Sequence, residues 1–189
     1  GSKMKHFINV ADFSSADILA IIDRADSLKL ANEQPLAGKV IGMIFEKPSN
    51  RTRLSFEVGI DRLGGKAVYI KGDEVQMGDR EPISHVSRVM SRYFDMIVYR
   101  TKNHDFLKEF ADFSTVPVIN GLSDQSHPCQ AVADALTIKN NFGSFDDVFL
   151  TYVGDGNNVC QSLMEISEKC GFKMAVVCPA KYAPKQVPS

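Results

Sequence analysis

Short β-rich runs alternate with helical patterns along almost the whole chain, and this alternation constrains the fold more than any other feature. The runs are residues 40–45, 67–70, 96–99, 116–119, 148–153 and 174–177. Between them apolar residues recur at helical spacing, as Val132, Ala135 and Leu136 do after Pro128. Repeated alternation of this kind predicts an α/β fold, with a mostly parallel sheet flanked by helices.

Local signals place several element boundaries. Residues 14–17, "SSAD", have the pattern of a capping box ahead of a first helix. A helix is expected over 49–63 because Gly64 and Gly65 provide a stop before the next strand. Pro82 is expected within the first turn of a later helix. Together these signals predict a helix followed by a strand–helix–strand unit.

Turn-forming residues cluster most densely at 140–147, "NNFGSFDD", which predicts a domain boundary there. We therefore expect one domain over 3–143 and the start of a second over 144–189. The second segment contains one strand–helix–strand unit, which would leave apolar strand faces uncovered. It is accordingly expected to be the first βαβ unit of a truncated α/β domain.

Composition excludes several classes of protein. The 22 Lys and Arg residues nearly balance 23 Asp and Glu residues, so no basic footprint for nucleic acid or an anionic membrane is present. Every apolar run is far shorter than the roughly 20 residues that span a bilayer. The chain has no C-x-x-C spacing and begins without a secretory signal pattern, so we expect reduced cysteines, no zinc site and a cytoplasmic protein.

Polar residues of unusual chemistry follow four of the expected strands. The four segments are "PSNRTR" after 40–45, Arg100 after 96–99, "SDQSHPCQ" after 116–119 and "GDGNN" after 148–153. In an open α/β sheet, ligands bind at the edge formed by the carboxyl ends of the strands. These segments are therefore expected to face one crevice.

The segment after residues 40–45 has the chemistry of an anion site. Ser49 is a good N-cap, and the free N–H groups and dipole of a helix start attract anions. Arg51 and Thr52 would add donors, and the planar fork of arginine suits phosphate better than lysine does. The alternative interpretation is a capped helix with exposed arginines.

The other segments also keep two interpretations on residue chemistry alone. Arg100 is either an anion ligand or a solvated strand end. His127 and Gln130 share one helical turn, where they would bind a primary amide or form a polar cap. "GDGNN" lacks the third glycine of a dinucleotide fingerprint, since Val159 stands there, and the chain contains no P-loop motif.

Taken together, these motifs resemble the transcarbamoylase family over nearly all 189 residues and in the same order. "FEKPSNRTRLSFE" is similar to the family's Ser-x-Arg-Thr-Arg carbamoyl phosphate loop, "HPCQ" to its His-Pro-x-Gln motif and "VYR" to its strand-end arginine. "QMG" at 76–78 resembles a loop that reaches into a neighbouring subunit's site. "GDGNN" resembles the ornithine branch of the family.

The resemblance implies a role for each matching residue. The phosphate of carbamoyl phosphate would be bound by Ser49, Asn50, Arg51 and Thr52. Arg100 would touch phosphate and carbonyl, and would polarise the carbonyl oxygen together with His127 and Thr52. Gln130 would hold the carbamoyl amide, and the amino-acid end of ornithine would be bound by Asn158 and Asn157. Gln76 would complete the site of an adjacent subunit in a homotrimer, while Arg53 would support the loop.

The implied reaction is carbamoyl transfer from carbamoyl phosphate to the side-chain amine of L-ornithine, giving L-citrulline and phosphate in arginine biosynthesis. It needs no metal or cofactor, because fixed donors would stabilise the developing oxyanion. Residues 3–143 would then be the carbamoyl-phosphate-binding domain, and 144–189 the start of the ornithine-binding domain. Cys129, where the family often has threonine, is not expected to act as a nucleophile.

The family's later Asp-x-x-x-Ser-Met-Gly and His-Cys-Leu-Pro segments do not occur in the chain, so little or no turnover by this chain is expected. Three alternatives remain open. The first is a transcarbamoylase acting on putrescine, an acylated ornithine or aspartate. The second is a catalytically inactive fragment that binds carbamoyl phosphate and assembles. The third is an α/β structural domain whose motif residues are only capping or solvated.

Overall fold

The computed structural model describes residues 5–75 and 77–184, and these form two compact units. Unit 1 contains described residues 5–8 and 33–123, and unit 2 contains 9–32 and 124–184. The first helix therefore packs with the C-terminal part of the chain rather than with the strands that directly follow it. The division at residues 143 and 144 that the sequence predicts for the family's two domains stays a prediction.

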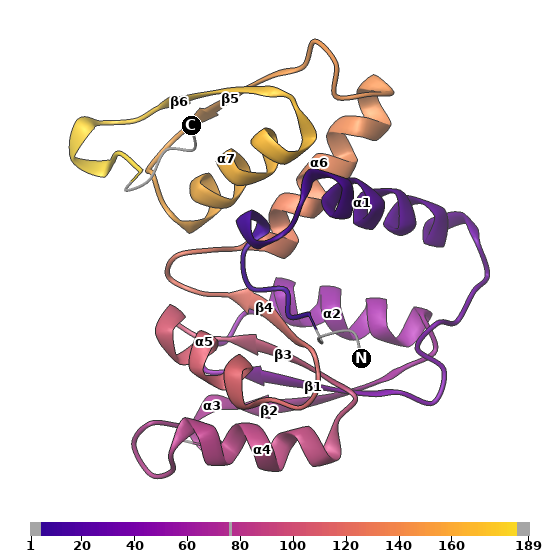
Figure 1. Cartoon of the computed structure of the whole chain (residues 1–189), viewed down its shortest axis with the longest axis vertical. Helices are drawn as coiled ribbons and strands as arrows, with labels where there is room; N and C mark the ends of the chain where they lie inside the picture. The colour runs from indigo at the N-terminus through magenta and orange to yellow at the C-terminus, as the bar shows by residue number, and fades with distance from the viewer. Residues whose placement is uncertain (1–4, 76, 185–189) are drawn as a thin grey trace. The chain divides into compact units, whose positions relative to one another are not determined.

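Unit 1 is built on a parallel four-stranded sheet, which confirms the predicted fold class (Figure 1). The strand order is β2 (Lys66–Lys71), β1 (Val40–Phe45), β3 (Met96–Arg100) and β4 (Val118–Leu122). In the register of β1 and β3, Phe45 is paired with Arg100. The carboxyl ends of these two central strands thus lie side by side.

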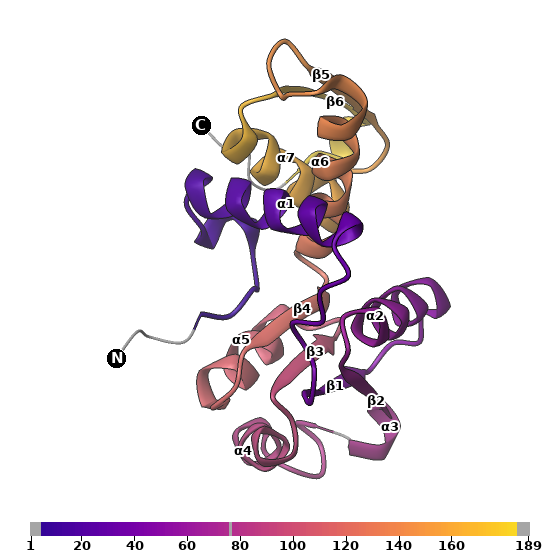
Figure 2. The same ribbon diagram turned by 90° about the vertical axis from the view of Figure 1, so that its right-hand side faces the viewer.

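Helices cover both faces of this sheet (Figure 2). One face carries α2 (Asn50–Arg62), and the other carries α4 (Ile83–Tyr93) and α5 (His104–Phe113). The period of two along β1 explains the arrangement. Ile44 packs with the α4 and α5 side chains, whereas Met43 and Phe45 pack with Ile60 of α2. A short helix, α3 (Gly72–Val75), follows β2.

The core between the sheet and α5 is dense and aromatic. Tyr99 and Phe110 are fully buried, and their rings meet edge to face with centroids 5.0 Å apart. Ser87 of α4 is also fully buried, and its hydroxyl donates to the Phe110 carbonyl over 2.6 Å. This hydrogen bond ties α4 to α5 on the face of the sheet opposite α2.

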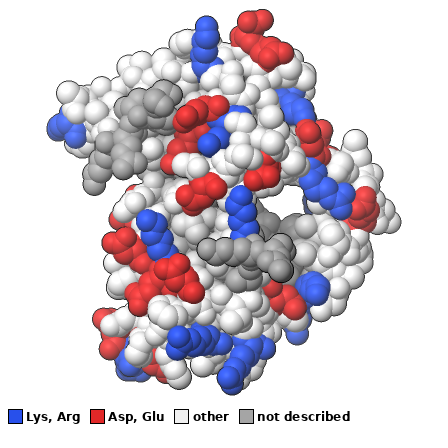
Figure 3. Space-filling view, in the orientation of Figure 1, with Lys and Arg blue, Asp and Glu red and all other residues white. Residues whose placement is uncertain are grey.

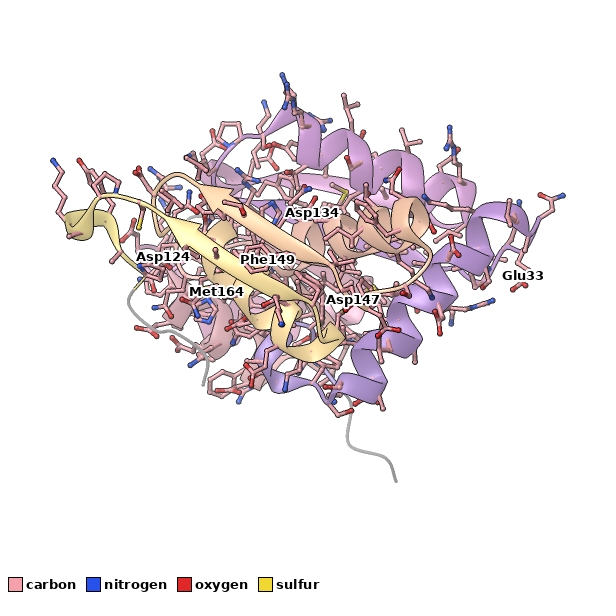
Figure 4. The ribbon with its side chains drawn as sticks, turned by 90° about the horizontal axis from the view of Figure 1, so that it is seen from above. Glu33, Asp124, Asp134, Asp147, Phe149 and Met164 are labelled. Carbon is pink, nitrogen blue, oxygen red and sulfur yellow. The ribbon has the colours of Figure 1, made fainter. Side chains whose placement is uncertain are left out.

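Unit 2 combines helices with a two-stranded parallel sheet. Its elements are η1 (Val10–Asp12), α1 (Ser15–Leu30), α6 (Pro128–Phe142), β5 (Phe149–Val153), α7 (Asn158–Cys170), β6 (Lys173–Val177) and η2 (Ala180–Tyr182). Large apolar side chains on the two strands are open to solvent. Phe149, labelled in Figure 4, is 63% exposed, Val153 is 76% exposed and Val177 is 57% exposed. The sheet therefore has the uncovered apolar surface that the sequence leads one to expect of a small βαβ unit.

Several element boundaries differ from those predicted. Pro82 is the N-cap of α4 and lies before its first turn. The sequence pattern predicts a helix near residues 106–110, but α5 begins at His104 because the Asn103 side chain accepts hydrogen bonds from the backbone N–H groups of Asp105 and Phe106. β4 runs on through Asn120, whose buried amide donates to the Ile8 carbonyl over 3.0 Å. A buried asparagine with a hydrogen-bonded amide cannot be recognised from a hydropathy pattern.

Glu165 of α7 provides a pH-dependent contribution to the stability of unit 2. Its Oε2 atom is buried without a hydrogen-bond partner in the described part of the chain. Desolvation raises the pKa of this carboxyl above its ordinary value of 4.5, and the Ala11 N–H partly offsets the effect. Just above pH 4.5 the folded state therefore holds more protons than the unfolded state, so stability falls as the pH rises through that range.

We expect Glu165→Gln to stabilise unit 2 more at pH 8 than at pH 5, because glutamine carries no charge to desolvate. Urea unfolding of both proteins at the two pH values measures the difference. Glu168→Gln is the matched control, since Glu168 lies on the same helix but is exposed. A Glu165→Gln effect of equal size at both pH values would contradict the assignment.

Candidate functional site

The start of α2 has the geometry of an anion site. Ser49 occupies the N-cap with extended backbone (φ −154°), and its carbonyl accepts the Arg53 N–H over 3.1 Å. Within the described residues the Ser49 hydroxyl makes no capping hydrogen bond to the helix. The N–H groups of Asn50, Arg51 and Thr52 lie in the first turn of the helix, where no preceding helical carbonyl can accept a hydrogen bond from them. They and the helix dipole therefore favour a bound anion.

Arg100 supplies a buried positive charge beside this helix start. It is the last residue of β3, is only 7% exposed, and donates from Nη1 to the Thr52 hydroxyl over 3.1 Å. Its Nε atom is buried and has no hydrogen-bond partner among the described residues. Desolvation lowers the pKa of the guanidinium. Burying a cation with an unpaired hydrogen-bond donor costs free energy unless an acceptor, preferably an anion, binds that donor.

Any positive potential at the start of α2 must come from residues close to it. Lys and Arg atoms alternate with Asp and Glu atoms over the face shown in Figure 3, in keeping with a formal net charge of -1. Arg51 is exposed at the first turn of α2. Arg53 is engaged elsewhere, since its Nε donates to Glu57 over 2.9 Å and its guanidinium lies 3.7 Å from the Tyr69 ring centroid. Arg51 and Arg100 are therefore the arginines available to an anion at the helix start.

Gln76, which the sequence assigns to a neighbouring subunit's site, lies outside the described residues. Its neighbour Met77 is 6% exposed and belongs to the core of unit 1. The role of Gln76 stays a prediction.

The start of α6 in unit 2 holds His127 and Gln130. His127 is the N-cap, Pro128 follows as the first helical residue, and the His127 N–H donates to the Ser162 hydroxyl over 2.8 Å. The hydroxyls of Ser126 and Ser162 are 3.1 Å apart. Ser162 of α7 thus fixes the backbone from which the His127 side chain projects.

An acidic residue orients the Gln130 amide. Gln130 Nε2 donates to Asp134 Oδ1 over 3.0 Å, one helical turn further along α6 (Asp134 is labelled in Figure 4). Desolvation raises the pKa of Asp134, and the hydrogen bond from Gln130 acts in the opposite direction. With Nε2 used in this way, Gln130 presents Oε1, a hydrogen-bond acceptor.

The "GDGNN" loop joins β5 to α7. Asn157 is the N-cap of α7; its Oδ1 accepts from the Cys160 N–H over 3.1 Å and from the Tyr152 hydroxyl over 3.3 Å. Asn158 Oδ1 accepts from the Val159 N–H over 2.9 Å. Both side chains proposed for ornithine therefore also order the loop. At Gly156 a Cβ atom would lie 2.4 Å from the Pro184 nitrogen, so the segment after β6 approaches too closely for any other residue.

Cys129 lies between Pro128 and Gln130, and desolvation raises the pKa of its thiol to about 12. At neutral pH the thiol is therefore protonated, which argues against a nucleophilic role.

The described structure distributes the predicted site residues over both units. Unit 1 brings the α2 start and Arg100 together, and unit 2 contains the remaining four: His127, Gln130, Asn157 and Asn158. The single crevice expected from the sequence stays a prediction. Among the described residues, no helix has the length and apolar content needed to cross a bilayer. That same part of the chain has no cluster of three or more His, Cys, Asp or Glu residues suited to a metal ion.

Sequence reasoning missed three residues that organise these sites: Glu46, Asp134 and Ser162. Two signals were available, because Glu46 directly follows the strand before the phosphate loop and Asp134 follows Gln130 at a helical spacing of four. Ser162 had no local signal, since its contact with His127 spans 35 residues.

A parallel α/β unit with a buried arginine and a helix start at the carboxyl edge of its sheet has the arrangement expected of an anion-binding α/β protein. Comparison with known families gives two matches that together cover most of the chain. The family model described as "Aspartate/ornithine carbamoyltransferase, carbamoyl-P binding domain" matches residues 5–140. A second model of the same family, described as "Asp/Orn binding domain", matches residues 146–188. The chain belongs to the aspartate/ornithine carbamoyltransferase family.

Individual relatives support the same placement. An ornithine carbamoyltransferase of Haloquadratum walsbyi is 45% identical over 97% of this chain and 62% of its own length. The anabolic ornithine carbamoyltransferase of Pseudomonas aeruginosa is 45% identical over 96% of this chain and 61% of its own length. The ornithine carbamoyltransferase structure from Pyrococcus furiosus superposes with a TM-score of 0.93 at 42% identity, over 96% of this chain and 59% of that one. The chain thus spans about three fifths of the length of these relatives.

Proposed function

We propose that the protein transfers the carbamoyl group of carbamoyl phosphate to the side-chain amine of L-ornithine, giving L-citrulline and phosphate. The observation that carries the proposal is the buried Arg100 guanidinium beside the N-terminus of α2, whose Nε finds no hydrogen-bond partner among the residues that the structure describes. Ornithine as acceptor is supported by the "GDGNN" loop and by the names of the relatives.

In the proposed mechanism, fixed donors hold the substrate and receive the charge that develops. The first turn of α2, with the side chains of Ser49, Asn50, Arg51 and Thr52, binds the phosphate. Arg100, Thr52 and His127 polarise the carbonyl oxygen. The neutral amine attacks the carbonyl carbon, and the oxygen takes up the electron pair. The phosphate then leaves with the bonding pair as the carbonyl re-forms, and the attacking nitrogen gives one proton to the departing phosphate, so that citrulline and hydrogen phosphate are the products.

Gln130 has a defined part in this proposal. Because its Nε2 donates to Asp134, its Oε1 is the atom that accepts a hydrogen bond from the carbamoyl NH₂. This bond would orient the carbonyl carbon towards the amine. Asn158 and Asn157 would bind the amino-acid end of ornithine from the loop that they also order.

The wider setting belongs to the same proposal: arginine biosynthesis in the cytoplasm, by a homotrimer in which Gln76 reaches a neighbouring site. The trimer is supported by Leu54 and Val58, which lie one turn apart on α2 and are 57% and 46% exposed. An apolar pair of this kind on a helix surface is suited to a subunit contact.

A second candidate function is carbamoyl phosphate binding without turnover. The exposed Phe149, Val153 and Val177 side chains favour it, since they show that the β5–β6 sheet alone does not form a closed domain. Other acceptors, namely putrescine, an acylated ornithine and aspartate, remain competing substrates.

The test is a carbamoylation assay with carbamoyl phosphate and each of the four amines, following phosphate release and the carbamoylated product. We expect slow citrulline formation at most from ornithine, because the later family segments do not occur in this sequence, and no product from the other three amines. A faster reaction with another amine would reject ornithine as acceptor. Calorimetric binding of carbamoyl phosphate without product from any amine would establish the second candidate.

Arg51→Ala is expected to weaken carbamoyl phosphate binding about 10-fold to 100-fold, the value of charge-assisted hydrogen bonds lost from one side chain. The fold should persist because Arg51 is exposed. Isothermal titration calorimetry measures the affinity, and Arg62→Ala, at the far end of the same helix, is the control. Unchanged binding by the Arg51 variant would refute its place in the site.

A further inference from the structure

We propose that Glu46 is a positioning residue that fixes the Arg100 guanidinium for the phosphoryl group, an inference that rests on the proposed function of the Arg100 site. Glu46 immediately follows β1 and precedes the loop that leads into α2. It acts through its neighbours and need not touch the substrate.

The Glu46 carboxylate holds the residues on either side of Arg100. Its Oε1 accepts from the Tyr99 hydroxyl over 2.6 Å, and its Oε2 accepts from the Thr101 hydroxyl over 2.5 Å. Successive side chains along a strand point to opposite faces. Fixing residues 99 and 101 on one face therefore fixes the direction in which Arg100 leaves the other face, towards Thr52 of α2.

The backbone strengthens this arrangement. The Glu46 N–H donates to the Arg100 carbonyl over 2.9 Å. Glu46 therefore forms hydrogen bonds with three consecutive residues, Tyr99, Arg100 and Thr101, at the carboxyl end of β3. The Thr101 hydroxyl in turn accepts the Asn103 N–H over 3.1 Å, and Asn103 caps α5. The end of β3 is thus held between Glu46 and the start of a helix.

Both hydroxyl donors depend on Glu46. Tyr99 is fully buried and Thr101 is 1% exposed, so neither hydroxyl has water as a substitute acceptor. Burial and the nearby Glu46 carboxylate raise the pKa of Tyr99, which keeps its hydroxyl a donor. Loss of the carboxylate would remove the acceptor of both buried hydroxyls, and the contact between the Tyr99 and Thr101 side chains could satisfy only one of the two donors, so the end of β3 could shift.

Glu46 is itself held on its other side. A Cβ atom at Gly72 would lie 2.4 Å from the Glu46 Cα, so the junction of β2 and α3 packs directly against it. Because Glu46 is also joined through Lys47 and Pro48 to Ser49, one residue links the phosphate-binding helix start with Arg100. The distance between the two anion-binding elements therefore depends on Glu46.

The test compares Glu46→Ala with Glu46→Gln, using inorganic phosphate and carbamoyl phosphate as probes in calorimetry. Alanine is expected to weaken phosphate binding at least 10-fold. Glutamine is expected to stay within threefold of the starting protein, because its amide can accept one hydroxyl and donate to the other after that hydroxyl rotates. Wild-type affinity in the alanine variant, or equal losses in both variants, would overturn the proposal.

Two further variants separate positioning from general destabilisation. Ser87→Ala removes a buried hydrogen bond on the α4–α5 face and should lower the unfolding temperature without changing phosphate affinity. If Glu46→Ala does not fold, Tyr99→Phe removes one of the two bonds and should weaken phosphate binding severalfold. Wild-type affinity in a folded Tyr99→Phe protein would then overturn the proposal.

The outcomes also separate this inference from the proposed function. An unaltered protein that binds phosphate but makes no citrulline would reject the function, and the Glu46 variants would still decide the positioning role. An unaltered protein that binds neither probe would overturn both.

Discussion

Arg100→Met is expected to abolish measurable carbamoyl phosphate binding, a loss of about 100-fold or more, while the unfolding temperature stays unchanged or rises. Arginine supplies donors to both phosphate and carbonyl in the proposed complex, and each charge-assisted bond is worth about 1.5–3 kcal/mol. Arg100 is 7% exposed, and within the described part of the chain its Nε has no hydrogen-bond partner, so the desolvation of this guanidinium destabilises the unliganded fold. Methionine removes that penalty at similar length.

Calorimetry with carbamoyl phosphate and thermal unfolding of the same samples measure both halves of this prediction. Arg53→Met is the matched control with the opposite expectation. It removes the Glu57 ion pair and the stacking on Tyr69, costing about 1 kcal/mol of stability, and should leave affinity within threefold. Retained binding by the Arg100 variant, or a large loss of its stability, would contradict the assignment of Arg100 as an anion ligand whose burial destabilises the unliganded fold.

Phe110→Ala is expected to destabilise unit 1 by about 3–5 kcal/mol, the usual cost of deleting a fully buried phenylalanine side chain. Phe110 is 0% exposed, and its ring packs edge to face on Tyr99. Alanine would leave a cavity between α5 and the sheet, beneath the strand that ends in Arg100. Urea unfolding followed by far-UV circular dichroism measures the loss, which is a large fraction of the stability of a typical domain.

Phe113→Ala on the same helix provides the comparison. Phe113 is 37% exposed and contacts Arg88, whose guanidinium lies 4.9 Å from the ring centroid. Its replacement should cost about 1–2 kcal/mol, less than at Phe110, because the ring is only partly buried and its loss leaves no closed cavity. Equal effects at the two positions would show that the α5 core does not hold unit 1 together.

Elements with strong local signals were predicted well. The strand over residues 40–45 matches β1, and the helix beginning at Pro128 matches α6. The Ser14 hydroxyl accepts from the Asp17 N–H as the capping box requires. These features depend on neighbouring residues and on the periodicity of apolar side chains, both of which can be read directly from the chain.

Features that depend on distant partners were not predicted. Asn120 is buried in β4 because Ile8, 112 positions away, accepts its amide. The first helix groups with α6 and α7, although the strands of unit 1 follow it in the chain. The Ser49 hydroxyl does not cap α2, although serine at that position predicts a cap. In the first two cases a long-range contact outweighed the local preference.

The amino-acid sequence by itself determined the α/β class and the order of the elements, and it predicted the residues proposed to carry the chemistry. Local spacing places Ser49 to Thr52 at a helix start and Arg100 at a strand end, and the motifs resemble one enzyme family. Only the tertiary structure decided how Arg100 is buried, which of its donors is used, and which residues hold it. The physical reason is that burial and hydrogen-bond partners depend on side chains 48 to 55 residues apart, which meet only when β1, β3 and α2 pack together.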